Sequence, residues 1–311
     1  MQTINVPEIA SRAMLASLKV TAGLGNRKDA EITAEVEARH NSRESGAWAK
    51  RLVAKSYLEP LRKVASEARA YHYAQTLPWA QDGARILPAA SAADYLAKMG
   101  AFESQYKTAA RELESVWPDV MADARARLNG MFRLDDYPAA GEVAELFTLS
   151  AAVLPLPTGD DFRVKLDSAT VAAIRADIDA QTSAAVTSAM GDVWRRLFDA
   201  VNRMKDGLAA FKPEESGAAR GTFRDSLVNN VRELADLLPR LNLTGDPNLA
   251  AMVAAVKADL TRVDAEELRT NPAERAKTAA TAGSLAAKIQ AMGAGYFGKP
   301  AASPAEAVTV A

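Results

Sequence analysis

Apolar residues recur at spacings of three and four along most of the chain, which is the pattern of helices that bury one face. One such face continues from residue 91 to residue 128, and a second runs from Asp167 to Phe211. Shorter helical patterns follow between residues 223 and 292. The two long apolar faces carry Tyr95, Met99, Phe102, Tyr106 and Leu113 in the first and Val193, Leu197, Val201, Met204 and Leu208 in the second.

Capping residues indicate where several of these helices begin. Asp29 and Asp167 each stand directly before a helical pattern, where a carboxylate can accept hydrogen bonds from the first free backbone N–H groups. Asp246-Pro247 and Asn271-Pro272 add a proline at the first helical position. Four helix starts can therefore be assigned from local chemistry alone.

One segment alternates apolar and cationic residues with a period of two, which is the pattern of a β-strand. In residues 162–166, Phe162, Val164 and Leu166 alternate with Arg163 and Lys165. A single strand needs a partner, and we expect it to pair with a strand around Met14 to Val20.

These patterns predict a mainly α protein, an elongated helical bundle with a long antiparallel coiled-coil-like helix pair and a small two-stranded sheet. If the two long apolar faces pair inside one chain, the protein is self-contained; if they do not, it must oligomerise. The expected parts are an N-terminal helical part with a short strand (1–90), the long helix pair (91–211) with a connector (131–167), a C-terminal helical part (212–297) and a disordered tail (298–311).

Composition narrows the possible functions. The 311 residues carry a net charge of −1, so no global charge draws the chain to nucleic acid or to an anionic membrane. The absence of cysteine excludes disulfides, thiolate metal sites and cysteine nucleophiles. No apolar run approaches the roughly 20 residues of a membrane span. We expect a cytoplasmic protein.

No residue pattern specific to catalysis is found. The segment Gly23 to Lys28 lacks the spacing of a phosphate-binding loop, and His40 and His72 have no second histidine at helical spacing. The acidic pairs Asp135-Asp136, Asp160-Asp161 and Glu266-Glu267 are neighbours that point in different directions, which favours solvated turn or cap residues. The sequence predicts no catalytic residue, no metal site and no cofactor, and therefore no enzyme.

Residues 39–69 hold the one local excess of charge. Eight lysines and arginines face three glutamates there, a surplus of five positive charges, and Trp48 and Tyr57 lie between them. Cations beside exposed aromatic rings can hold phosphates and stack bases. Against this, Trp48, Leu52 and Val53 fall where a buried face is expected. The candidate nucleic-acid-binding residues are Arg39, Arg43, Lys50, Arg51, Lys55, Arg62 and Lys63.

Aromatic residues and prolines concentrate between residues 71 and 90. Tyr71, His72, Trp79 and Arg85 are the candidates there, either as an interaction surface or as a structural plug. We favour the plug, with Trp79 packed against Tyr95 or Met99, because a tryptophan beside a proline turn is more often core than surface.

Residues 14 to 240 resemble a family of proteins of unknown function carried by tailed phages and prophages. The resemblance is specific between residues 71 and 138. It is carried by Tyr71-His72, Thr76-Leu77-Pro78-Trp79, Asp82-Gly83, Arg85, Leu87-Pro88, Ala124-Arg125, Arg127-Leu128, Gly130-Met131-Phe132 and Asp136-Tyr137-Pro138.

The resemblance implies a mostly helical phage protein, often encoded near an AAA-type ATPase of the MoxR or cobalt-chelatase-like group, acting in the host cytoplasm. It supplies no catalytic residues. The first functional hypothesis is a non-enzymatic adaptor that binds such an ATPase. The alternatives are a nucleic-acid-binding accessory protein of phage replication or recombination and a self-assembling structural protein.

Overall fold

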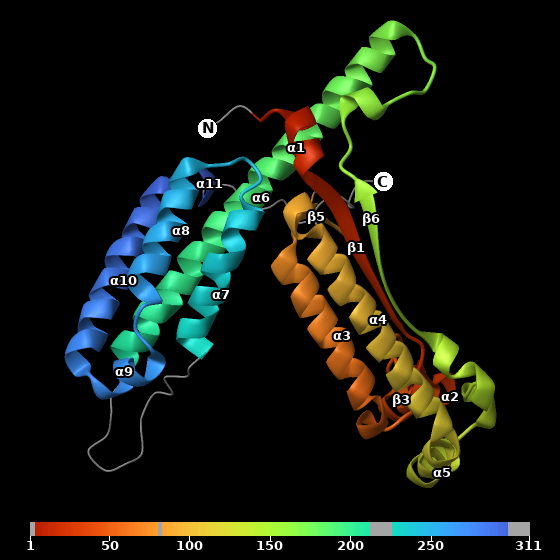
Figure 1. The fold of residues 1–311 in the computed structure, drawn as a ribbon. Helices are drawn as coiled ribbons and strands as arrows, with labels where there is room; N and C mark the ends of the chain where they lie inside the picture. The colour runs from red at the N-terminus through yellow and green to blue at the C-terminus, as the bar shows by residue number, and fades with distance from the viewer. Residues whose placement is uncertain (1–3, 80–82, 212–225, 298–311) are drawn as a thin grey trace. The chain divides into compact units, whose positions relative to one another are not determined.

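The chain forms two compact units in a computed structural model that describes residues 4–79, 83–211 and 226–297 (Figure 1). Unit 1 consists of Met1–Ala16, Gln75–Ala93 and Val153–Ala311, and unit 2 of Ser17–Ala74 and Asp94–Ala152. The organisation expected from the sequence followed the chain in order. The compact units do not follow the order of the chain, because the chain passes between them several times.

Four strands form a sheet in the order β4-β5-β1-β6. These strands are β1 (Ala13–Ala22), β4 (Leu77–Pro78), β5 (Ala84–Pro88) and β6 (Phe147–Pro155). The strand expected around Met14 to Val20 is confirmed as part of β1. Its expected partner is wrong, because residues 162–166 form no strand and β6 lies beside β1 instead.

The burial of side chains explains why β6, and not residues 162–166, takes this place. Phe147 and Leu149 are buried, while Thr148 and Ser150 are exposed, so the first part of β6 also alternates. The side chains of Val164 and Leu166 are exposed. Alternation alone therefore does not select a strand; an available sheet edge and a core to cover are also needed.

Unit 1 is built mainly of helices around one apolar core. Its longest helix, α6 (Ser168–Ala210), begins after Asp167, whose side chain accepts a hydrogen bond from the N–H of Thr170 at 2.9 Å. α6 packs against α7 and α10, and the fully buried Trp194 lies in the shared core. The helices of this unit are α1 (Val6–Arg12), α6, α7 (Ser226–Leu241), α8 (Pro247–Leu260), α9 (Ala265–Thr270), α10 (Pro272–Met292), α11 (Ala294–Phe297) and the short 3-10 turns η1 (Ala89–Ser91) and η6 (Gly159–Asp161).

Unit 2 places two long helices side by side (Figure 1). The ring of Tyr71 on α3 (Lys55–Gln75) stacks on that of Tyr95 on α4 (Ala92–Ser115), with centroids 6.2 Å apart. The remaining elements are β2 (Asn26–Lys28), α2 (Ala30–His40), β3 (Ala49–Arg51), α5 (Trp117–Leu128) and the 3-10 turns η2 (Asn129–Met131), η3 (Leu134–Asp136), η4 (Ala140–Glu142) and η5 (Ala144–Leu146). β2 and β3 pair antiparallel.

The chain is mainly helical, as expected, but its described residues form a four-stranded and a two-stranded sheet where one two-stranded sheet was expected, and the elongated bundle with its long coiled-coil-like pair is not confirmed. Tyr95, Met99 and Phe102 of α4 are buried within unit 2, and Val193 and Leu197 of α6 are buried within unit 1. Each apolar face is thus covered in its own unit. The argument for obligatory self-assembly, which required an uncovered face, loses its basis.

The four helix starts assigned from capping chemistry are confirmed at α2, α6, α8 and α10. Within the three described ranges, no helix is both long enough and apolar enough to cross a membrane. The expected disordered tail, 298–311, lies outside the described residues, and so does much of the start of the expected C-terminal part.

Trp79 packs against the apolar core of unit 1. Its expected neighbours, Tyr95 and Met99, belong to the core of unit 2. The side chain is half-buried, and its indole Nε1 is buried without a hydrogen-bond partner among the residues that the structure describes. Apolar contact, rather than a polar anchor, therefore holds the ring.

We expect Trp79→Ala to lower the free energy of unfolding of unit 1 by about 3 kcal/mol, because it removes a large side chain from packed surroundings. Trp79→Phe should cost less than about 1.5 kcal/mol, since it keeps most of the apolar contact. Urea unfolding followed by circular dichroism measures both, with Tyr73→Ala as a control at an exposed ring. A Trp79→Ala curve that superimposes on the parent curve would show that the ring is not a plug.

Candidate functional site

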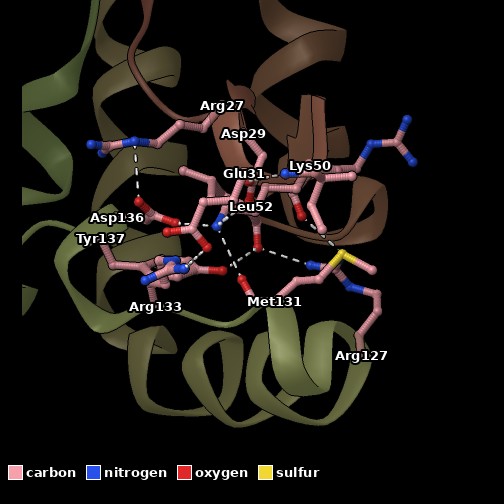
Figure 2. Close-up of polar contacts among 12 residues, drawn as sticks. Arg27, Asp29, Glu31, Lys50, Leu52, Arg127, Met131, Arg133, Asp136 and Tyr137 are labelled. Atoms are coloured by element: carbon pink, nitrogen blue, oxygen red, sulfur yellow. Dashed lines mark hydrogen bonds and ion pairs between the residues drawn. The ribbon is translucent and has the colours of Figure 1, made fainter. Parts of the chain in front are cut away.

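Lys50 is the centre of the densest group of charged side chains that the structure describes (Figure 2). Its side chain is 3% exposed. The Nζ atom lies 2.7 Å from Oδ2 of Asp136 and 3.0 Å from Oδ2 of Asp29, and it donates to the backbone oxygen of Met131 at 3.0 Å. Three oxygens thus lie within 3.0 Å of one ammonium nitrogen. We call Lys50, Asp29, Asp136 and Met131 the Lys50 cluster.

Local structure brings each member of the cluster into place. Lys50 lies in β3 opposite Arg27 of β2, and Asp29 follows β2 directly. Asp29 also caps α2, where its Oδ1 accepts a hydrogen bond from the N–H of Ile32 at 3.2 Å. Met131 ends η2 and Asp136 ends η3, in the chain that follows α5. One lysine therefore joins the β2–β3 pair and α2 to a segment 81 residues further along.

Further contacts tie the same two segments together around the cluster. Arg27 forms an ion pair with Asp136 at 3.1 Å, and Arg133 forms one with Glu31. Leu52 offers its backbone oxygen to the Tyr137 hydroxyl at 3.0 Å and to Arg127 at 2.8 Å. We call residues 23–53 and 117–138, which these contacts join, the head of unit 2.

The pKa values in the cluster keep its charges in place. Burial lowers the pKa of Lys50, but its hydrogen bonds to Asp136 and Asp29 and the charges of these carboxylates outweigh burial and raise it above its usual 10.5. The hydrogen bond from Lys50, helped by the Ile32 N–H, lowers the pKa of Asp29 below 3.8. Asp29 thus stabilises the fold above pH 3.8 and loses this effect as the pH falls through its lowered pKa. Lys50 stabilises the fold below pH 10.5 and loses the effect as the pH rises through its raised pKa.

These directions decide what the cluster can do chemically. A lysine acts as a base or a nucleophile when its pKa is lowered and an electron pair is free. Lys50 has a raised pKa, and its ammonium group is held by two ion pairs and a hydrogen bond to a backbone oxygen. Within the described ranges, no three histidine, aspartate or glutamate side chains lie close enough together to hold a metal ion. The cluster is suited to fixing a shape.

The structure separates the predicted nucleic-acid-binding residues. Lys50 is buried and ion-paired, so it cannot reach a phosphate, and this part of the prediction is corrected. The other six side chains are exposed, and the prediction for them is untested. They are Arg39 on α2, Arg43 after it, Arg51 on β3, and Lys55, Arg62 and Lys63 on α3.

The candidates around residues 71 to 85 make internal contacts. His72 is buried, and its Nδ1 shares a hydrogen bond of 2.7 Å with the hydroxyl of Tyr95, whose pKa burial raises to about 12. Tyr71 stacks on Tyr95. Arg85 donates from Nε to the Thr76 hydroxyl at 2.7 Å and so ties β5 to the residue before β4. Each of these side chains thus contacts other residues of the chain, and the choice between plug and interaction surface stays a prediction.

Sequence reasoning missed Asp136, which we had interpreted as a solvated turn residue. Its side chain is only 9% exposed and contacts both Lys50 and Arg27. The neighbouring Tyr137 is the feature of the sequence that could have indicated burial of Asp136. Its ring stacks on Phe132 with centroids 5.3 Å apart and packs near Trp117. A turn that is followed by such a packed aromatic residue is anchored, and its carboxylate can then be buried.

No family model, no curated protein and no solved structure matches the chain in the three comparisons made with known proteins.

We expect Lys50→Met to lower the free energy of unfolding of unit 2 by about 3 kcal/mol, because it leaves two carboxylates without their shared cation. Arg51→Met, the exposed neighbour on the same strand, should change it by less than about 0.5 kcal/mol. Urea unfolding of both variants measures the difference.

Adding Asp29→Asn and Asp136→Asn to Lys50→Met should recover part of the loss, because the triple variant leaves no buried charge unpaired and asparagine can still cap α2. Equal stability of Lys50→Met and Arg51→Met would contradict the structural role of the cluster.

Proposed function

We propose that the protein is a non-enzymatic adaptor that binds another protein through the head of unit 2. The observation that carries the proposal is the closed Lys50 cluster, in which the two carboxylates are balanced by Lys50 and by Arg27 beside it. The amine and carboxylate groups of the cluster hold residues 23–53 and 117–138 in one arrangement. A fixed arrangement lowers the entropy that a surface loses when it binds, and this favours recognition.

The head offers apolar side chains to a partner. Trp48 is 37% exposed and Leu134 is 63% exposed, although both are attached to backbone that the cluster holds. Trp48 accepts a backbone hydrogen bond from Asp29 at 3.0 Å, and Leu134 begins the turn that ends at Asp136. Val36 and Met131 are also exposed on the head. Tryptophan and other large apolar residues contribute most of the binding energy in many protein interfaces.

We propose an AAA-type ATPase of the MoxR or cobalt-chelatase-like group as the partner, in the host cytoplasm of a phage infection. The support is the resemblance to phage proteins and the place of the residues that carry it. Arg127, Met131, Asp136 and Tyr137 belong to the resembling motifs, and each contributes a contact that holds the head. These four residues of the motifs thus help to hold the backbone on which Trp48 and Leu134 are exposed.

The test is association with the AAA ATPase encoded nearest to this protein, measured by isothermal titration calorimetry and by the ATP turnover of the mixture. The parent should bind at micromolar concentration and change the turnover. The double variant Trp48→Ala, Leu134→Ala should bind at least tenfold more weakly, because both side chains belong to the proposed surface, and thermal melting should show that the variant folds.

Leu96→Ala is the matched control, since Leu96 is an exposed apolar residue on α4, outside the head. It should bind like the parent. No association at micromolar concentration, or equal binding by the double variant and the parent, would reject the head as the docking surface.

A further inference from the structure

The exposed side of α3 carries cations at a regular interval. Its buried side contains Leu58, Leu61, Ala65, Ala68 and His72. On a line roughly 90° around the helix from the centre of this buried face, Lys55, Arg62 and Arg69 are exposed and stand seven residues apart. Seven residues complete almost two helical turns, so the three cations lie along one line of the helix, about 10 Å from one to the next.

Ser66 and Tyr73 occupy the same line, at the intervals of three and four residues that bring side chains to one face. Tyr73 is 56% exposed and stands one turn beyond Arg69. We call Lys55, Arg62, Arg69 and Tyr73 the α3 row. It combines three cations and one exposed ring over about 27 Å of helix.

The cations of the α3 row are not engaged in ion pairs with any residue that the structure describes. Glu59 flanks the row about 60° around the helix from Arg62, and Glu67 lies on a different side. Exposed cations without a carboxylate partner retain their hydration and counterions. They are therefore available to an anionic partner.

The chemistry of the row distinguishes between two kinds of anionic partner. An acidic helix would need an apolar seam beside its charges, but the apolar face of α3 is already buried inside unit 2. Surface ion pairs alone contribute about 0–1 kcal/mol each, which is too little to bind an acidic helix. A phosphate backbone needs no seam, because it gains free energy from the release of its condensed counterions.

We infer that the α3 row binds single-stranded nucleic acid. Lys55, Arg62 and Arg69 contact phosphates, and Tyr73 stacks on a base. The exposed ring selects a single strand over a duplex, because only an unpaired base offers a free face. This activity goes beyond the adaptor role and uses different residues, so either can fail without the other.

Fluorescence anisotropy of a labelled 20-nucleotide single strand of mixed sequence tests the inference, with the duplex of the same sequence as comparison. The parent should bind the single strand at micromolar concentration in 50 mM salt, and more tightly than the duplex. The logarithm of the association constant should fall with the logarithm of salt concentration with a slope of about −2, as three phosphate contacts require.

Two variants separate the parts of the row. The triple variant Lys55→Glu, Arg62→Glu, Arg69→Glu should bind at least thirtyfold more weakly than the parent. Tyr73→Ala should bind about fivefold to tenfold more weakly with the salt slope unchanged, because it removes stacking and no phosphate contact. All four side chains are exposed, and thermal melting should show that both variants fold.

The matched control is Arg39→Glu, Arg43→Glu, Arg51→Glu, which makes the same change in net charge at three exposed cations outside the row. It should bind within about threefold of the parent. The inference is overturned by absent binding at 50 mM salt, by an equal loss in the control, by equal affinity for the duplex, or by equally effective competition from polyglutamate, which would indicate an acidic protein partner.

Discussion

The ammonium group of Lys50 is almost fully buried. A buried ammonium group is stable only when oxygen atoms of the protein replace the water molecules that would hydrate it. Asp29, Asp136 and the backbone oxygen of Met131 supply these atoms. The requirement also acts on Asp29, because its buried carboxylate would lose its ion pair without the lysine, whereas Asp136 would keep the one with Arg27. The head of unit 2 therefore forms as a whole, with the β2–β3 pair, the start of α2 and the turns after α5 in one arrangement.

The same requirement connects the fold to the two surfaces proposed for binding. Trp48 and Leu134 are exposed, yet their backbone belongs to segments that the Lys50 cluster joins. The α3 row depends on a different part of unit 2, in which Tyr71, His72 and Tyr95 hold α3 against α4. Internal polar and aromatic contacts thus fix two surfaces of unit 2, one apolar and one cationic.

The sequence predicted what local chemistry determines. Asp29 and Asp167 identified helix starts because a cap and its helix are adjacent in the chain. The long apolar faces were also identified. The residues that cover them were not, because a periodic pattern indicates that a face is buried but not which element packs against it. For the same reason the prediction of a strand at 162–166 was wrong, whereas β6, whose pattern is less regular, pairs with β1.

The candidate site was less accessible to sequence reasoning than the fold. Lys50 was grouped with exposed cations because its burial depends on residues more than eighty positions away. Asp136 was assigned to solvent because its acidic neighbour suggested an open turn. Both residues are explained by one long-range contact that no short spacing encodes. The exposed cations of α3 were within reach, because helical periodicity places Lys55 and Arg62 on one line.

Hydrogen exchange measured by mass spectrometry on the parent and on Lys50→Met tests most directly whether one lysine holds two segments together. The account predicts that amides of α2 and of residues 129–137 lose protection together, by at least tenfold, while amides of α6 in unit 1 keep theirs. Loss of protection in α2 alone, with residues 129–137 unchanged, would contradict it.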